Sequence, residues 1–158
     1  MEAVLETSRV LYLLPPHHRN YGKRIVKSPK VFLLDVGLAT FVLGLHTKKA
    51  ILQGPTLGAL VETAVLGEWI KAFGQLGQRP HLFFWRSSGG HEVDLIIVHD
   101  NRLYALEVKA TATPTPPMAL ARSLELAGPE AAGALACQVD EPCALRPGIR
   151  AVPWHLGW

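Results

Sequence analysis

The segment HEVDLIIVHDNRLYALEVK, residues 91–109, decides the fold, because it reads as two strands joined by a tight turn. Its apolar runs at Glu92–His99 and Arg102–Lys109 predict neighbouring strands, and Asp100-Asn101 between them is typical of a two-residue hairpin loop. Apolar residues occur on both faces of these strands, as in the central strands of a sheet. We therefore predict an antiparallel hairpin in which His99 faces Arg102.

Two carboxylates of this hairpin fall opposite each other in the predicted register. Asp94 faces Glu107, with their Cβ atoms about 5 Å apart. Lys109 lies on the same face as Glu107, because side chains alternate along a strand. Two like charges at this distance repel each other unless a cation or a proton intervenes. A hard divalent cation with oxygen ligands suits the gap, and we expect Mg²⁺ or Mn²⁺.

A metal at this position would suit the hydrolysis of phosphodiesters. A bound divalent ion polarises a phosphoryl oxygen and lowers the pKa of a bound water molecule. Lys109 could then orient or deprotonate the attacking water, or stabilise the charge that develops. The opposing interpretation is a structural ion-pair network in which Lys109 bridges both acids and Glu92.

A helix over residues 56–73 carries a third carboxylate. Gly54-Pro55 marks its start, Thr56 is a suitable cap, and glycines follow its end. Glu62 lies on the apolar stripe of this helix, together with Leu66, Trp69 and Phe73. A carboxylate on a buried face is costly without a partner, so we expect Glu62 to reach the metal site, directly or through water.

The remaining pattern predicts further elements on both sides of this helix and hairpin. Strands are expected at 9–14, 31–34, 81–85, 134–139 and 149–152, and helices at 35–45 and 118–127.

The segment from residue 7 to residue 34 contains no aspartate or glutamate and is strongly basic. Five of its cations lie close together between residues 19 and 30: Arg19, Lys23, Arg24, Lys27 and Lys30. Several cations on one segment would contact nucleic-acid phosphates with salt-dependent, sequence-independent affinity. The alternative is a solvated loop between two apolar strands.

Composition limits the class of protein. A chain of 158 residues, of which 49% are hydrophobic and 18% charged, can bury a core and is not disordered overall. It contains no apolar run of about 20 residues and no signal-peptide pattern, so we expect a cytoplasmic protein without a membrane segment. Cys137 and Cys143 fit neither a redox motif nor a zinc site.

Four blocks of sequence together resemble one protein family. They are LPPHHRN (14–20), KSPKVFLLDVGLA (27–39), GALVE (58–62) and HEVD (91–94). From about Arg9 to Trp154 the chain resembles the uncharacterised domain at the C-terminus of prokaryotic AAA+-type ATP-binding proteins. Glu62, Asp94 and the tripeptide Glu107-Val108-Lys109 also resemble the PD-(D/E)XK nuclease-like superfamily, with a valine where the proline of that pattern usually stands.

The resemblance implies an α/β (α+β) fold with a restriction-endonuclease-like core, in which helices flank a mixed central sheet. It also implies two parts: a basic N-terminal segment over 1–50, which would link to an ATPase, and a nuclease-like domain over 51–158. In that family an ATPase module precedes the domain. Because this chain has no G-x-x-x-x-G-K-[ST] motif, the ATPase half is absent from it, and we expect a fragment, a stand-alone relative or a truncated form, with an ATPase module as a possible partner.

These observations lead to the hypothesis of a Mg²⁺-dependent nuclease-like domain that acts on nucleic-acid phosphodiesters. Asp94 and Glu107 would hold the metal with the carbonyl of Val108, Lys109 would assist the water, and Glu62 would support the metal. The alternative is a non-catalytic module that binds nucleic acid or protein and serves an ATPase. The apolar composition also suggests self-association as a third interpretation.

Overall fold

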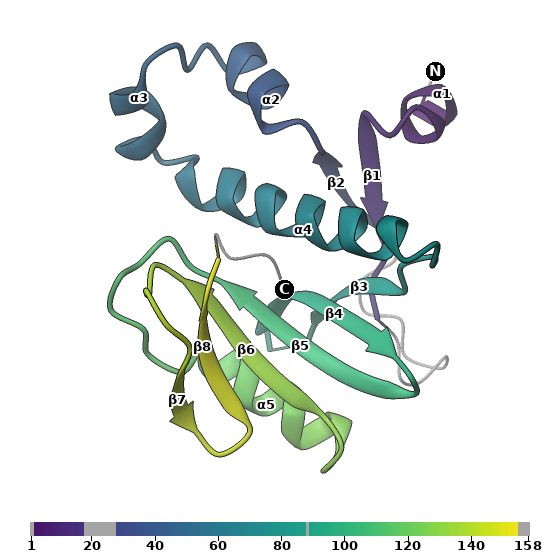
Figure 1. The fold of residues 1–158 in the computed structure, drawn as a ribbon, viewed down its shortest axis with the longest axis vertical. Helices are drawn as coiled ribbons and strands as arrows, with labels where there is room; N and C mark the ends of the chain where they lie inside the picture. The colour runs from purple at the N-terminus through teal and green to yellow at the C-terminus, as the bar shows by residue number, and fades with distance from the viewer. Residues whose placement is uncertain (1, 18–27, 88, 155–158) are drawn as a thin grey trace.

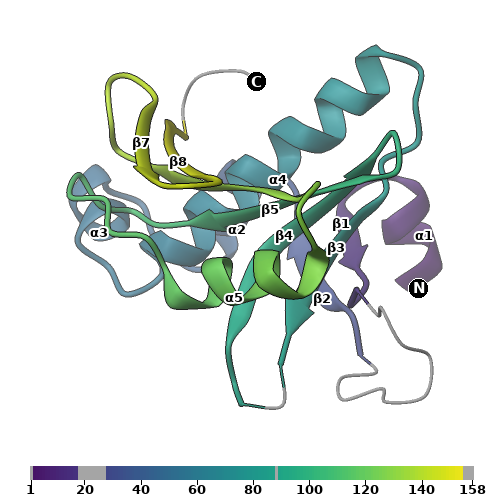
Figure 2. The same ribbon diagram turned by 90° about the horizontal axis from the view of Figure 1, so that it is seen from below.

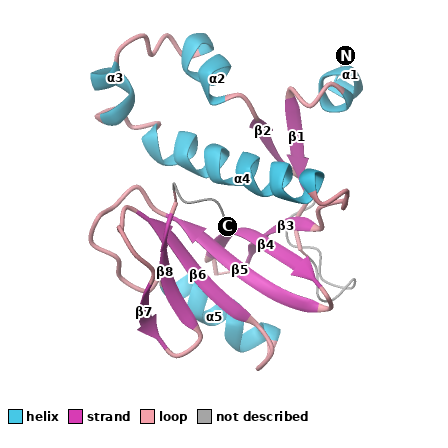
Figure 3. Cartoon of the chain, viewed as in Figure 1, coloured by secondary structure: helices cyan, strands magenta, loops and turns pink. Residues whose placement is uncertain are grey.

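A six-stranded mixed sheet with helices on both faces forms the main body of the protein. The computed structural model describes residues 2–17, 28–87 and 89–154. The strand order is β3-β4-β5-β6-β8-β7. The strands are β3 (Leu82–Arg86), β4 (Glu92–His99), β5 (Arg102–Val108), β6 (Ala132–Cys137), β7 (Cys143–Arg146) and β8 (Ile149–Pro153). Figures 1 and 3 show this sheet with a long helix along one side, which confirms the predicted α/β class with a mixed sheet flanked by helices.

The predicted hairpin is present in the predicted register. Strands β4 and β5 pair antiparallel from His99↔Arg102 to Leu95↔Leu106. Asp100 and Asn101 both have positive φ, 48° and 61°, as the two central residues of a type I′ turn require. This turn matches the twist of the flanking strands, so it fixes which residues face each other further along the hairpin.

Parallel pairing continues the sheet beyond the hairpin. Strand β6 pairs parallel with both β5 and β8, and β7 pairs antiparallel with β8 at the far edge. The helix α5 (Met118–Ala127) lies in the connection between β5 and β6, as a crossover between parallel strands requires. Figure 2 shows α5 against the face of the sheet opposite the long helix.

The long helix α4 (Leu57–Gln75) covers the other face and builds the largest core cluster. Its residues Val61, Val65 and Leu66 are buried against Leu95 and Leu106 of the hairpin. Thr56 is the N-cap residue of this helix, as predicted, but its side chain makes no capping hydrogen bond. The residue itself has helical backbone angles, φ −87° and ψ −5°, rather than the extended conformation typical of a capping residue.

The N-terminal segment contributes smaller elements that pack onto this body. They are α1 (Glu2–Thr7), β1 (Leu11–Leu14), β2 (Lys30–Leu33), α2 (Val36–Val42) and α3 (Lys48–Leu52). Strands β1 and β2 form a separate antiparallel pair, and their residues Leu14 and Phe32 are buried in the same cluster as α4. The amide of Phe84 donates to the carbonyl of Pro15 (3.0 Å), which joins this segment to the edge of the main sheet.

Most predicted elements are confirmed to within a few residues, whereas three short ones were not predicted: α1, α3 and β7. None of the helices in the described ranges has the length and apolar character needed to cross a membrane.

Candidate functional site

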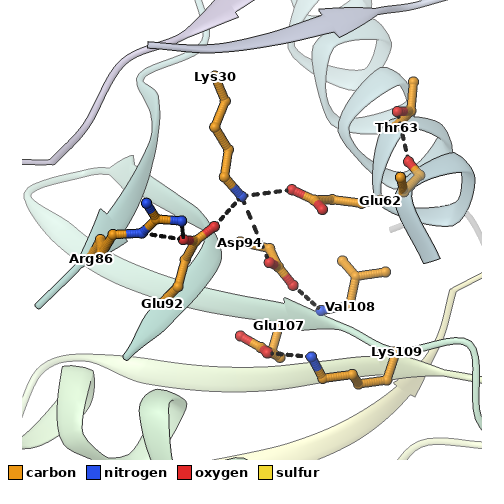
Figure 4. Close-up of polar contacts among 10 residues, drawn as sticks. Lys30, Glu62, Thr63, Arg86, Glu92, Asp94, Glu107, Val108 and Lys109 are labelled. Carbon is orange, nitrogen blue, oxygen red and sulfur yellow. Dashed lines mark hydrogen bonds and ion pairs between the residues drawn. The ribbon is translucent and has the colours of Figure 1, made fainter. Parts of the chain in front are cut away.

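A cluster of charged side chains lies where β4, β5 and α4 meet, and Lys30 is at its centre (Figure 4). The Lys30 ammonium donates to Glu62 on α4 (3.0 Å) and lies 2.5 Å from Oε1 of Glu92 on β4. It also lies 3.9 Å from Oδ1 of Asp94. Strand β2 therefore supplies one cation that holds three carboxylates from two other elements.

Asp94 reaches this cluster through an irregularity in the sheet. The pairing of β3 with β4 shifts register between Phe83 and Trp85, so β4 bulges at this point. Val93 packs in the cluster beneath α5, whereas Leu95 packs beneath α4, so the normal alternation of sides is interrupted around Asp94. The bulge lets the Asp94 side chain reach both the ammonium of Lys30 and the end of strand β5.

The ladder between β4 and β5 ends one step before the predicted pair of Asp94 and Glu107. Instead, the Val108 amide donates to Oδ2 of Asp94 (2.8 Å). In the register of the hairpin this amide would otherwise face the carbonyl of Val93. The side chain of Asp94 thus replaces a backbone acceptor, and the two acids are neighbours at the point where the strands separate rather than a regular cross-strand pair.

Glu107 is the most buried acid of the cluster. Its side chain is 7% exposed, and its Oε1 accepts from the ammonium of Lys109 (2.8 Å). Its other oxygen, Oε2, is buried and has no hydrogen-bond partner among the described residues. Burial, and then the negative charge of Asp94, raise the pKa of Glu107 to about 7. The protein therefore buries a carboxylate without fully compensating its charge.

The pKa values of the other three acids depend on the balance between burial, which raises them, and contacts with positive or hydrogen-bonding groups, which lower them. Burial, and then the charge of Asp94, raise the pKa of Glu62, while Lys30 opposes this shift. Burial also raises the pKa of Asp94, against the hydrogen bond from Val108. Burial alone would raise the pKa of Glu92, but the contacts with Lys30 and Arg86 outweigh it and lower that pKa. Glu92 is thus the acid best compensated by positive charge.

The cluster carries more negative than positive groups. Four carboxylates, Glu62, Glu92, Asp94 and Glu107, face three cations, Lys30, Arg86 and Lys109. Either a proton on Glu107 or an additional cation would balance them. The buried oxygen of Glu107 and the carboxylate of Asp94 are hard oxygen donors, which are the ligands that Mg²⁺ and Mn²⁺ prefer.

The ligand set for such a cation is narrower than the sequence suggests. Within the described residues, no group of three or more His, Cys, Asp or Glu side chains is placed to hold a metal ion. Glu62 is instead held by Lys30. Asp94 and Glu107 remain the acids whose oxygens a divalent ion could use, because Glu107 brings a buried oxygen without a partner in the described chain.

The residues predicted from the sequence are distributed as follows. Glu62, Asp94, Glu107 and Lys109 all belong to the cluster. Lys30, assigned from the sequence to nucleic-acid binding, lies inside the cluster, whereas Arg19, Lys23, Arg24 and Lys27 lie outside the described residues.

Two contributions to the cluster were missed. Arg86 holds the outer oxygen of Glu92, and Lys30 rather than Lys109 is the bridging lysine. Glu92 was predicted only as a member of an ion-pair network with Lys109, whereas in the structure it pairs with Lys30 and Arg86.

Comparison with known proteins identifies related sequences without a described activity. Residues 57–156 match a family model described as a domain of unknown function (DUF4143), and residues 2–49 match another domain of unknown function (DUF8612). The chain is 37% identical over 111 residues to the uncharacterized proteins Mb2031c of Mycobacterium bovis and Rv2008c of Mycobacterium tuberculosis. Each alignment covers 70% of this chain but 24% of the relative, so the chain spans about a quarter of their length. No solved structure gave a significant match.

Proposed function

We propose that this chain, which belongs to the DUF4143 family of domains of unknown function, carries a divalent-metal-dependent phosphodiesterase site of the PD-(D/E)XK nuclease type. Nucleic acid is the proposed substrate. The observation that carries the proposal is the buried carboxylate of Glu107, whose Oε2 has no partner within the described chain and lies beside the charge of Asp94. Such a group is costly for the fold unless a proton or a cation compensates it, which favours a role in binding a cation.

Each residue of the proposed site would have a separate task. Asp94 and Glu107 would hold the ion with the Val108 carbonyl, and the hydrogen bond from the Val108 amide keeps Asp94 in position. A divalent ion there would polarise the phosphoryl oxygen and activate water. Lys109 is half exposed and bound to Glu107, so its ammonium is placed at the boundary between the acids and solvent. There it would stabilise the negative charge that develops on the phosphate.

The test is cleavage of plasmid DNA and of single-stranded DNA and RNA oligonucleotides in the presence of Mg²⁺ or Mn²⁺. We expect cleavage by the wild type that is lost in Asp94→Asn and strongly reduced in Lys109→Met. Glu68→Gln is the matched control, because Glu68 is an exposed acid of α4 that pairs only locally with Lys71 in the described structure. Cleavage that survives both site substitutions would reject the proposed assignment.

A second candidate function is a non-catalytic module that binds a protein partner such as an ATPase. Two observations favour it. Lys30 already compensates three of the four acids, as in a structural ion-pair network. In addition, α2, α3 and the residue that follows α2 expose large apolar side chains: Leu38, Phe41, Val42, Leu43 and Leu52. Figure 1 shows these helices projecting from the sheet, where a partner could cover them.

This second function predicts a different result from the first. Phe41→Ser and Val42→Ser would abolish capture of an ATPase partner supplied from the same cell, while leaving any Mn²⁺ uptake unchanged. Absence of cleavage and of metal uptake, together with a partner that dissociates from Phe41→Ser, would favour the binding module over the nuclease.

A further inference from the structure

We propose that Lys30 is an internal counter-cation that competes with a divalent ion for the site and thereby sets how tightly the ion binds. This inference rests on the proposed function, because it takes Asp94 and Glu107 as the ligands of the ion. It adds a residue to the site that comes from outside residues 57–156, the range matched by the family model.

The position of Lys30 is fixed from both ends of its side chain. Its backbone pairs with Leu14 in the β1–β2 ladder, and Leu14 is fully buried in the main core. Its ammonium lies 5.5 Å from the centre of the Phe84 ring and contacts acids from both α4 and β4. A lysine held in this way is a built-in part of the cluster rather than a surface side chain that happens to lie nearby.

Asp94 is the residue that the two cations would share. Its Oδ1 faces Lys30 at 3.9 Å, while its Oδ2 accepts from the amide of Val108, next to Glu107. A divalent ion bound to Asp94 would lie close to the ammonium of Lys30. Repulsion between a double and a single positive charge at such a distance, in a partly buried site, is large compared with thermal energy. The ion and the ammonium therefore oppose each other at this carboxylate.

Glu92 offers the ammonium of Lys30 an ion-pair partner that remains available when the ion binds. Glu92 is 2.5 Å from the ammonium and is not one of the proposed ligands, and Arg86 holds its other oxygen. Lys30 can release Asp94 and keep Glu92, so that binding of the ion leaves no unpaired ammonium. The exchange releases Glu62 as well, and this acid can then support the ion through water, as its position on α4 allows.

The experiment measures Mn²⁺ affinity by titration calorimetry for the full chain and four variants. Lys30→Met removes the charge and keeps much of the side chain, whereas Lys30→Arg keeps the charge. Lys71→Met is the matched control, because it removes one positive charge from an exposed position on α4 where only Glu68 is paired with it in the described structure. Asp94→Asn removes a proposed ligand. Circular dichroism verifies that each variant is folded.

We expect Lys30→Met to bind Mn²⁺ about tenfold more tightly than the wild type or better. Lys30→Arg and Lys71→Met should remain near the wild-type affinity. Equal affinities of Lys30→Met and the wild type, with loss of binding in Asp94→Asn, would overturn this inference and leave the proposed function standing. Absence of Mn²⁺ uptake from both the wild type and Lys30→Met would contradict the proposed function, and this inference with it.

A second measurement uses only the wild-type chain, so it stands even if Lys30→Met does not fold. The ¹⁵N resonance of the Lys30 ammonium reports its ion pairs, and Mg²⁺ is added until binding is saturated. We expect this resonance to shift as Lys30 leaves Asp94 and Glu62, while the resonance of Lys71 remains in place. A Lys30 resonance that does not respond to saturating Mg²⁺ would show that the two cations do not compete.

Discussion

The two halves of the charged cluster differ in how their acids are compensated. In the first half, Glu62, Glu92 and Asp94 surround Lys30, and Arg86 adds a further contact to Glu92. In the second half, Glu107 has Lys109 on one oxygen, while its other oxygen is buried and unpaired within the described chain. Each acid of the first half has a cation within reach, although burial still raises the pKa values of Glu62 and Asp94. In the second half, one buried oxygen of Glu107 has neither a proton donor nor a cation beside it in the described chain. This difference indicates where an ion would add most to the molecule.

The largest effect is expected at Asp94, which belongs to both halves. In Asp94→Asn the charge is lost but the shape is retained, so the Val108 amide still has an acceptor. We expect cleavage to fall by about 1,000-fold or more, because the ion loses a charged ligand and the attacking water loses its activation. Initial cleavage rates with saturating Mg²⁺ would measure this loss. Glu68→Gln serves as the control, and an equal loss in both variants would show that the effect is not specific to the site.

The next largest effect is expected in the pH dependence of stability, to which Glu107 should contribute most. The pKa of Glu107 is raised from 4.5 to about 7, so the folded state binds more protons than the unfolded state between these values. Stability therefore falls as pH rises through this window, by roughly 3 kcal/mol, and Glu62 and Asp94 act in the same direction because their pKa values are also raised.

In Glu107→Gln most of this loss should disappear. Urea unfolding at pH 5 and pH 8 measures it, with Glu68→Gln as the control. Saturating Mg²⁺ should restore much of the stability of the wild type at pH 8, because the bound ion replaces the proton. A wild-type chain that is equally stable at both pH values would show that Glu107 is compensated in some other way.

A smaller effect is expected at Lys109, and it should be confined to activity. The side chain is 53% exposed, so its ion pair with Glu107 contributes at most about 1 kcal/mol to stability. In Lys109→Met we expect cleavage to fall by about 100-fold while Mn²⁺ affinity stays the same or rises, since a positive charge has been removed beside the ligands. A parallel loss of metal binding and cleavage would assign Lys109 a structural role instead.

The second half of the cluster could be predicted from the sequence because its geometry is local. Asp100-Asn101 specifies a two-residue turn, and the turn then fixes the register of both strands as far as Leu95 and Leu106. The sequence therefore placed Glu107 and Lys109 correctly beside the end of β4. The hydrogen bond from the Val108 amide to Asp94 was not predictable, because it depends on the register shift between β3 and β4.

The first half could not be predicted in the same way because its central cation comes from far along the chain. Lys30 lies in a basic segment, where composition gives no reason to select one lysine over its neighbours. Only the packing of β2 against the main body, with Leu14 and Phe32 in the shared core, directs this side chain toward Glu62 and Glu92. Long-range packing of this kind leaves no spacing or periodicity in the sequence.

The smallest effect on stability and metal affinity is expected at Arg86, a half-exposed residue that pairs with Glu92 in the first half of the cluster. Its side chain is 48% exposed, and it pairs with Glu92, which Lys30 also holds. In Arg86→Gln the acid keeps its lysine, so we expect a loss of less than about 1 kcal/mol in the free energy of unfolding and little change in Mn²⁺ affinity. Lys30→Met should cost more stability without metal, because it leaves three acids without their shared cation. If Arg86→Gln destabilised the chain as much as Lys30→Met, Glu92 would be the acid that organises the cluster, and the division into a compensated and an uncompensated half would have to be redrawn around it.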